Sequence, residues 1–154
     1  MQKKTLFVAF IALLFAFTGC KKKESTTQEA PADKFVGSYE LAIKYNTYID
    51  GEKVEHGNLS GILNITAIDD TKVNVEGIIE FGGGDAPIYS TTGIVDENGV
   101  LYLEPNEYTG GTTPLEISYQ EIAYDSPLVF KSSMTGTLQG YQMEYEMTNT
   151  ATKL

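Results

Sequence analysis

The sequence predicts an all-β domain: an antiparallel meander of about eight strands that closes as a small barrel. Two observations predict it. Apolar residues recur at every second position over several stretches, and no stretch after Phe35 keeps the three-and-four spacing of an amphipathic helix. Turn-forming pairs such as Asp50-Gly51 and Asn98-Gly99 separate these stretches at short intervals. Short connections favour antiparallel neighbours, and a closed meander leaves no sheet edge exposed; an open sandwich is the competing architecture.

The period of two also assigns the faces of each strand. The stretch that ends the chain shows it most clearly, because a polar residue follows each of its apolar positions, Tyr141, Met143, Tyr145 and Met147. We place the strands at residues 36–48, 53–68, 71–81, 87–95, 99–107, 113–124, 128–138 and 141–152. The acidic residues at alternate positions are expected to face solvent: Glu40, Glu76, Glu80, Glu104, Glu144 and Glu146.

The first nineteen residues have the pattern of a signal peptide. Lys3 and Lys4 precede an apolar run from Leu6 to Phe17, which is shorter than the ~20 residues of a membrane-spanning helix. The run ends at Phe17-Thr18-Gly19-Cys20, which resembles the lipobox of bacterial lipoproteins, although Phe17 stands where the family usually has Leu. The resemblance implies that Cys20 is diacylated and becomes the mature N-terminus, which anchors the protein to a membrane.

Residues 20–34 are expected to form the lipidated Cys and a flexible tether. This segment has no large apolar side chain, and Cys20 is the only cysteine of the chain, so no intramolecular disulfide can form. Lysine directly after the Cys fits lipoproteins sent to an outer membrane, and Glu24 is a weak match to the surface-export signal of Bacteroidetes lipoproteins. The sequence therefore predicts a lipid-anchored protein of the bacterial cell envelope, with the membrane face left open. Residues 35–154 form the single folded domain.

The charge of the chain argues against nucleic acid as a partner. There are 21 acidic residues against 11 lysines and no arginine, for a formal net charge of −10. Nucleic-acid binding relies on lysine and arginine against phosphate. We expect possible partners to be a small apolar ligand or an envelope protein.

No residue pattern predicts catalysis or a metal site. His56 is the only histidine and has no Gly-x-Ser-x-Gly partner, so a solvated histidine is the simpler interpretation. Asp69-Asp70 and Asp96 lie in segments typical of turns, without the distal ligand of a calcium loop, and residues 82–84 lack the lysine of a phosphate loop. Glu121 is the carboxylate that continues an inward register. We expect a protein that is not an enzyme and needs no cofactor or metal.

Tyrosine is the unusual feature of the composition, because the chain has ten Tyr and no Trp. Tyrosine and methionine at inward positions, Met147 among them, suit an amphipathic cavity with a few hydrogen-bonding groups. They also suit the filled core of a small barrel, which is the simpler interpretation. A ligand-binding barrel would need a cavity of about 300 Å³ or more, and we expect it near Tyr39, Tyr119, Tyr141 and Tyr145. The candidate ligand-binding residues are Tyr39, Tyr45, Tyr119, Tyr141, Met143 and Tyr145.

The domain as a whole is similar to the calycin-like or lipocalin-like barrels of small bacterial lipoproteins. The similarity lies in Gly37-Ser38-Tyr39 at the start of the first strand and in the number of strands that follow. Lipocalins have Gly-x-Trp at this point and an Arg over the Trp; this chain has Tyr39 and no Arg. The resemblance implies a barrel with a small cavity that binds an apolar or amphipathic ligand. The alternative is an accessory lipoprotein that docks on a partner through its acidic surface.

Overall fold

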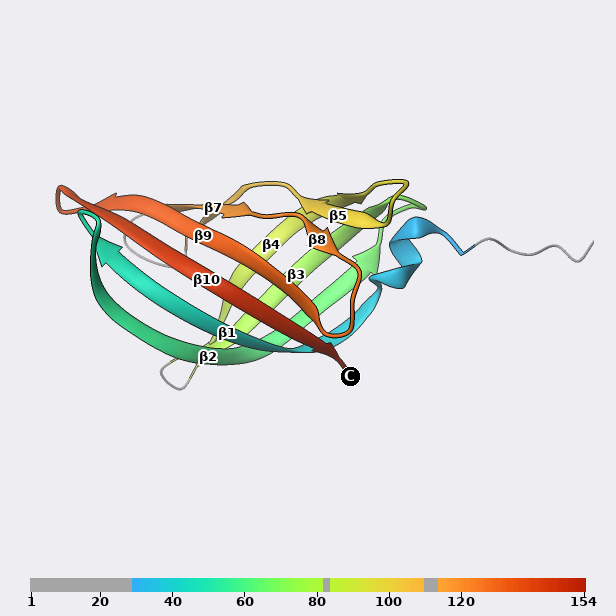
Figure 1. Cartoon of the computed structure of the whole chain (residues 1–154), viewed down its shortest axis with the longest axis horizontal. Helices are drawn as coiled ribbons and strands as arrows, with labels where there is room; N and C mark the ends of the chain where they lie inside the picture. Colours follow the sequence, from blue (N-terminus) through green and yellow to red (C-terminus); the bar gives the residue numbers. More distant parts are fainter. Residues whose placement is uncertain (1–28, 82–83, 110–113) are drawn as a thin grey trace, which may run out of the picture.

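The computed structural model describes residues 29–81, 84–109 and 114–154, with the side chains of residues 81–86 left out. Cys20 and the signal peptide lie outside the described residues. The strands form one antiparallel sheet that curls round on itself (Figure 1). The strands are β1 (Gly37–Ile49), β2 (Glu52–Ala67), β3 (Lys72–Phe81), β4 (Gly84–Val95), β5 (Val100–Leu103), β6 (Asn106–Tyr108), β7 (Leu115–Tyr119), β8 (Ile122–Ala123), β9 (Leu128–Leu138) and β10 (Tyr141–Lys153).

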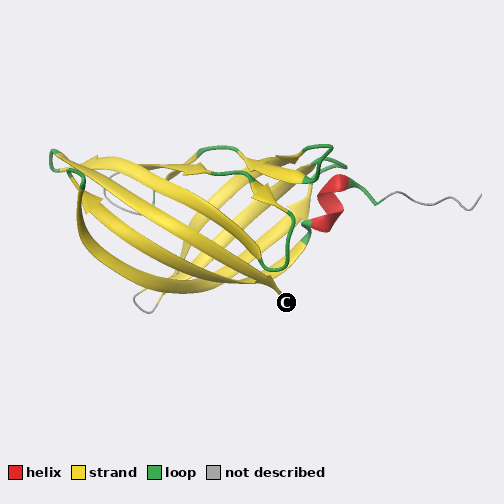
Figure 2. Ribbon diagram, in the orientation of Figure 1, coloured by secondary structure: helices red, strands yellow, loops and turns green. Residues whose placement is uncertain are grey.

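The all-β antiparallel fold predicted from the sequence is confirmed. The order of the strands in the sheet is β6-β7-β9-β10-β1-β2-β3-β4-β5-β8. The first and last long strands, β1 and β10, are neighbours over most of their length, from Tyr39 opposite Lys153 to Ile49 opposite Met143. This pairing brings the two ends of the folded domain together and curls the meander into a barrel-like shell (Figure 2).

Two predicted strands are interrupted, which is why the structure has more strands than the sequence predicted. The predicted strand 99–107 divides into β5 and β6, and 113–124 divides into β7 and β8. Val100 pairs with Ala123 and Asn106 with Ile117, so both short pairings keep one register. Between them, Glu104 donates its N–H to Thr92 of β4 and Gln120 donates its N–H to Lys131 of β9. Between the two short pairings, each interrupted strand is thus hydrogen-bonded to its neighbour on the other side.

A short 3₁₀ helix, η1 (Pro31–Lys34), lies at one end of the barrel (Figure 2). Ala32 is buried and donates its N–H to the carbonyl of Asp70 at 3.1 Å. Phe35, which follows η1, is also fully buried, with its ring edge-on to Tyr124 at 5.4 Å between centroids. The expected flexible tether up to residue 34 is therefore too long, because the folded part begins at η1.

Two tight hairpins lie at the opposite end of the barrel from η1 (Figure 1). Asp50 and Gly51 connect β1 to β2, and Gln139 and Gly140 connect β9 to β10. All four residues have positive φ, between 50° and 89°, the conformation of the two-residue turns that match the twist of paired strands. We call this the hairpin end and the other the η1 end.

Carboxylates that the sequence placed in turns do hold turns. The side chain of Asp69 accepts hydrogen bonds from the backbone N–H groups of Thr71 and Lys72, and that of Asp96 from Asn98 and Val100. These bonds lower the pKa of both carboxyl groups. The predicted outward residues Glu40, Glu76, Glu80, Glu104, Glu144 and Glu146 are all exposed.

The inward position expected for Glu121 is wrong, because Glu121 lies in the break between β7 and β8 and is exposed. Among the described residues, no helix has the length and apolar character needed to cross a bilayer.

Candidate functional site

A pocket of about 270 Å³ lies inside the curled sheet, in the half of the barrel nearer the hairpin end. Its walls come from eight of the ten strands, all but the short β5 and β8. The lining residues are mostly apolar: Tyr45, Glu55, Leu59, Ile79, Ile88, Tyr108, Leu115, Met134, Tyr145 and Met147. The volume lies just below the ~300 Å³ expected of a small-molecule pocket. Of the four tyrosines expected around the cavity, Tyr39, Tyr119, Tyr141 and Tyr145, only Tyr145 lines it.

Glycine positions the first tyrosine of the pocket. Tyr45 of β1 pairs with Gly57 of β2, and a Cβ at Gly57 would lie 2.7 Å from the Tyr45 hydroxyl oxygen. The ring therefore lies across the glycine, and its hydroxyl donates a 3.2 Å hydrogen bond to Glu55 two residues along β2. The pKa of Tyr45 is raised, by burial first and by the Glu55 carboxylate second.

A β-bulge brings Ile88 into the pocket. Ile78 pairs with Pro87 while Gly77 pairs with Tyr89, so Ile88 is the extra residue on β4. A bulge redirects side chains relative to the regular alternation, and here both Ile88 and Tyr89 are buried. Ile88 lines the pocket, and Tyr89 lies deeper in the barrel.

Three polar side chains form a closed hydrogen-bonded ring in the barrel interior. The Tyr89 hydroxyl donates to Oδ1 of Asn149 at 2.8 Å, and Nδ2 of Asn149 donates to the Ser132 hydroxyl at 3.0 Å. The Ser132 and Tyr89 oxygens lie 3.1 Å apart, so the serine hydroxyl can donate back and close the ring. Asn149 also donates to the carbonyl of Phe130 at 3.3 Å.

This polar ring lies directly behind the pocket wall. The Tyr89 hydroxyl is 3.7 Å from Sδ of Met147, a pocket residue. Asn149 is 0% exposed, and burial raises the pKa of Tyr89 to about 12. Because its members satisfy one another, the ring joins β4, β9 and β10 without leaving a free polar group for a ligand.

Tyr119 extends the polar ring toward the interrupted strands. Its hydroxyl donates to the side chain of Asn106, and its ring meets that of Tyr89 edge-on at 5.7 Å. Burial, followed by the neighbouring Tyr89, raises the pKa of Tyr119. Tyr119 therefore packs as part of the interior and anchors β7 to β6.

The six candidate residues predicted from the sequence lie in different parts of the barrel. Tyr45 and Tyr145 line the pocket. Tyr39 is buried at the η1 end, where its hydroxyl donates to the Phe35 carbonyl at 2.6 Å. Met143 is half-buried opposite Ile49. The inward position expected for Tyr141 is wrong: it is 56% exposed, because it starts β10 at the hairpin tip beyond the core.

Several residues that line the pocket are not among the candidates predicted from the sequence. Leu59, Ile79, Leu115 and Met134 follow the period of two and could have been included on that signal. Ile88 could not, because the bulge reverses its side. Tyr108 lies on β6, a strand of three residues with too little pattern to assign a face.

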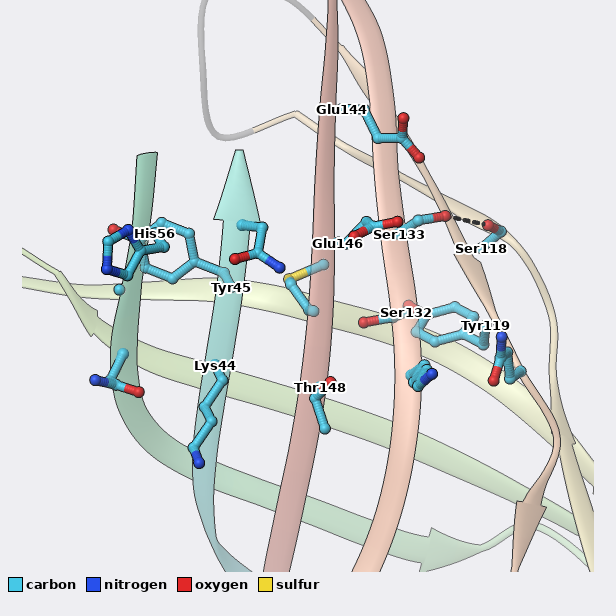
Figure 3. A pocket seen from close by; sticks show the side chains of 16 residues that line it. Lys44, Tyr45, His56, Ser118, Tyr119, Ser132, Ser133, Glu144, Glu146 and Thr148 are labelled. Atoms are coloured by element: carbon cyan, nitrogen blue, oxygen red, sulfur yellow. Dashed lines mark hydrogen bonds between the residues drawn. The ribbon is translucent and has the colours of Figure 1, made fainter. Parts of the chain in front are cut away.

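A second, more polar hollow of about 770 Å³ lies along β1, β2, β7, β9 and β10 (Figure 3). Besides outward side chains, its lining includes four residues of the barrel interior: Tyr45, Tyr119, Ser132 and Met147. Its outward side chains include both charges: Lys44, His56, Lys131, Glu144 and Glu146. Ser118 and Ser133 are hydrogen-bonded across β7 and β9 at 2.9 Å. His56 is exposed, as the sequence suggested, and lies among these surface side chains.

Comparison with known proteins adds no relative: no protein-family model, no curated protein and no solved structure matched the chain.

Proposed function

We propose that this protein is a membrane-anchored lipoprotein of the cell envelope whose barrel binds a small apolar or amphipathic ligand. The observation that supports binding most directly is the interior pocket of about 270 Å³, with its apolar lining. A filled core would place side chains in this space, since protein interiors pack to the density of organic crystals. Behind Met147, the side chains of Tyr89, Ser132 and Asn149 hydrogen-bond to one another, so they offer no unpaired polar group to a ligand in the pocket.

The η1 end supports the calycin-like part of the proposal. The chain has no arginine to cover the aromatic ring of the first strand, but the Lys153 ammonium lies 5.9 Å from the centre of the Tyr39 ring. This cation comes from the last strand, which pairs with the first at this point. A barrel closed at the η1 end would admit a ligand from the hairpin end.

The proposed anchor rests on the lipobox-like Phe17-Thr18-Gly19-Cys20 alone. A diacylated cysteine would hold the barrel at the membrane through the residues that precede η1. Two acyl chains are needed for stable anchoring, whereas one gives marginal binding. In this proposal the protein holds its ligand near the envelope and does not change it chemically.

Titration with phenylnaphthylamine, a neutral dye that fluoresces in apolar surroundings, tests the proposed binding. The chain from Ser25 to Leu154 contains every described contact of the barrel and can be prepared without detergent. We expect saturable fluorescence with one dye per chain. The variant Leu59→Phe, which enlarges a pocket side chain, should abolish it, and Ile62→Phe on the outer face of the same strand should not.

Absence of saturable dye binding in a folded chain would contradict the proposal. Docking on an envelope protein through the acidic surface would then be the function to pursue. Dye binding that Leu59→Phe leaves unchanged would place the binding elsewhere and contradict the pocket assignment.

A further inference from the structure

We propose that the ligand of this pocket is an amphiphile with a cationic amine as its polar end, held by Glu55 and the pocket tyrosines. This inference rests on the proposed function, because it specifies the ligand class of the same pocket.

The lining of the pocket carries negative charge only. Among the described residues that line the pocket, Glu55 is the only one with a charged side chain. It is exposed, and its Oε1 accepts the hydrogen bond from Tyr45, which fixes the carboxylate beside the lining. An amine end would meet this carboxylate favourably, whereas a carboxylate end would be repelled by it.

Three tyrosines accompany the carboxylate. Tyr45, Tyr108 and Tyr145 all line the pocket and are all half-buried. Tyrosine rings attract cations through their electron-rich faces, and their hydroxyls can accept hydrogen bonds from an ammonium group. Several aromatic rings together with an acidic group are the surroundings that suit an alkylammonium ion.

The rest of the pocket suits an alkyl chain. Its other lining residues are Leu59, Ile79, Ile88, Leu115, Met134 and Met147. The nearby polar ring of Tyr89, Ser132 and Asn149 uses its hydrogen bonds internally and would gain nothing from a polar ligand atom. The polar end of a ligand therefore belongs beside Glu55, and its apolar part against the aliphatic and methionine side chains.

The lysine nearest to Glu55 in the sequence does not reverse this charge. Lys53 lies two residues before Glu55 on β2, but it is exposed and does not line the pocket. The net charge of the chain, −10, likewise favours a cation over an anion of the same length.

Displacement of phenylnaphthylamine by three compounds of equal chain length tests the inference. At pH 7 octylamine is a cation, octanol is neutral and octanoate is an anion, as the ordinary pKa values of amines and carboxylic acids require. We expect octylamine to displace the dye at the lowest concentration and octanoate at the highest. Equal or stronger displacement by octanoate would overturn the inference.

The variant Glu55→Gln removes the charge and keeps an oxygen that can accept the Tyr45 hydrogen bond. We expect it to raise the octylamine concentration for half-displacement about two- to fivefold, the range for cation contacts at exposed sites, and to leave octanol unchanged. Glu52→Gln, also on β2 but outside the pocket lining, is the matched control and should leave the order unchanged.

An unchanged octylamine response in Glu55→Gln would overturn the amine assignment. The two proposals fail differently. A folded chain that never takes up the dye contradicts ligand binding itself, whereas dye uptake with no preference among the three compounds contradicts only the amine assignment.

Discussion

Tyr89 and Asn149, 60 residues apart in the chain, are joined inside the barrel by a 2.8 Å hydrogen bond from the tyrosine hydroxyl to Oδ1 of the asparagine. The bond connects β4 to β10 across the interior, and Ser132 of β9 completes the ring. Burying polar groups costs free energy unless they are paired, and these three pair with one another. The ring therefore joins β4, β9 and β10 through polar contacts inside a core that is otherwise mainly apolar.

Removing the phenol oxygen should destabilise the domain. In Tyr89→Phe, Asn149 and Ser132 each lose a buried partner, so we expect the free energy of unfolding in urea to fall by about 1–3 kcal/mol. Tyr102→Phe is the control, because Tyr102 is exposed on β5. Equal unfolding midpoints for the two variants would contradict a structural role of the ring.

The same tyrosine should make the stability depend on pH in the alkaline range. The pKa of Tyr89 is about 12 in the folded chain and about 10 when unfolded, so the unfolded chain loses its proton first. The contribution is present below pH 10 and is lost as the pH rises to about 12. Between pH 10 and 12 the wild type should lose stability more steeply than Tyr89→Phe, as measured by urea unfolding at each pH. Parallel curves would contradict the assignment.

Two glycines beneath tyrosine rings should differ in their tolerance of a methyl group. A Cβ at Gly77 would lie 2.5 Å from Cδ2 of the fully buried Tyr89, and one at Gly57 would meet the half-buried Tyr45. We expect Gly77→Ala to lower the unfolding free energy by about 1–3 kcal/mol and Gly57→Ala to lower it less, since Tyr45 has room to move toward solvent. Thermal unfolding of both variants checks the order, and a larger loss in Gly57→Ala would contradict it.

The segment around η1 should behave as part of the folded domain. Phe35 is fully buried and packs against Tyr124, so Phe35→Ala should cost about 3–5 kcal/mol in urea unfolding. Asp33→Ala, at an exposed position of η1, is the matched change and should cost little. A loss below 1 kcal/mol in Phe35→Ala would contradict a place for this segment in the folded domain.

The anchor has its own test. Cys20→Ser should abolish incorporation of labelled palmitate and leave the protein uncleaved or released from the membrane fraction. Continued palmitate incorporation by this variant would contradict lipidation at Cys20. A conservative control is Ser25→Ala, which lies beyond the lipobox-like residues and should be labelled as the wild type is.

The sequence predicts the long strands well because they are regular. The alternation in β1, β3 and β10 and the Asp50-Gly51 and Gln139-Gly140 turns determine most of the sheet. Prediction from the sequence fails where the alternation of apolar and polar residues is interrupted. Pro105, which has no N–H to donate, follows the end of β5 and signals the break before β6, yet the apolar residues around it read as one strand.

The pocket is harder to predict than the strands, for two physical reasons. The bulge at Ile88 shifts the alternation by one residue, so the sides of Ile88 and Tyr89 cannot be read from the pattern. Alternation also continues beyond the core, so the pattern predicts an inward Tyr141, although this residue lies at an exposed hairpin tip. Tyr45 and Tyr145 lie in the regular middle of long strands, where the pattern is reliable.

Native mass spectrometry of the domain from Ser25 to Leu154, prepared without detergent and incubated with an extract of the cell envelope, is the most decisive test of ligand binding. We expect a reproducible non-covalent adduct of one small molecule per chain. Leu59→Phe should lose the adduct and Ile62→Phe should keep it. A bare, folded domain in repeated preparations, or an adduct that Leu59→Phe retains, would contradict the assignment of the interior pocket as a ligand site.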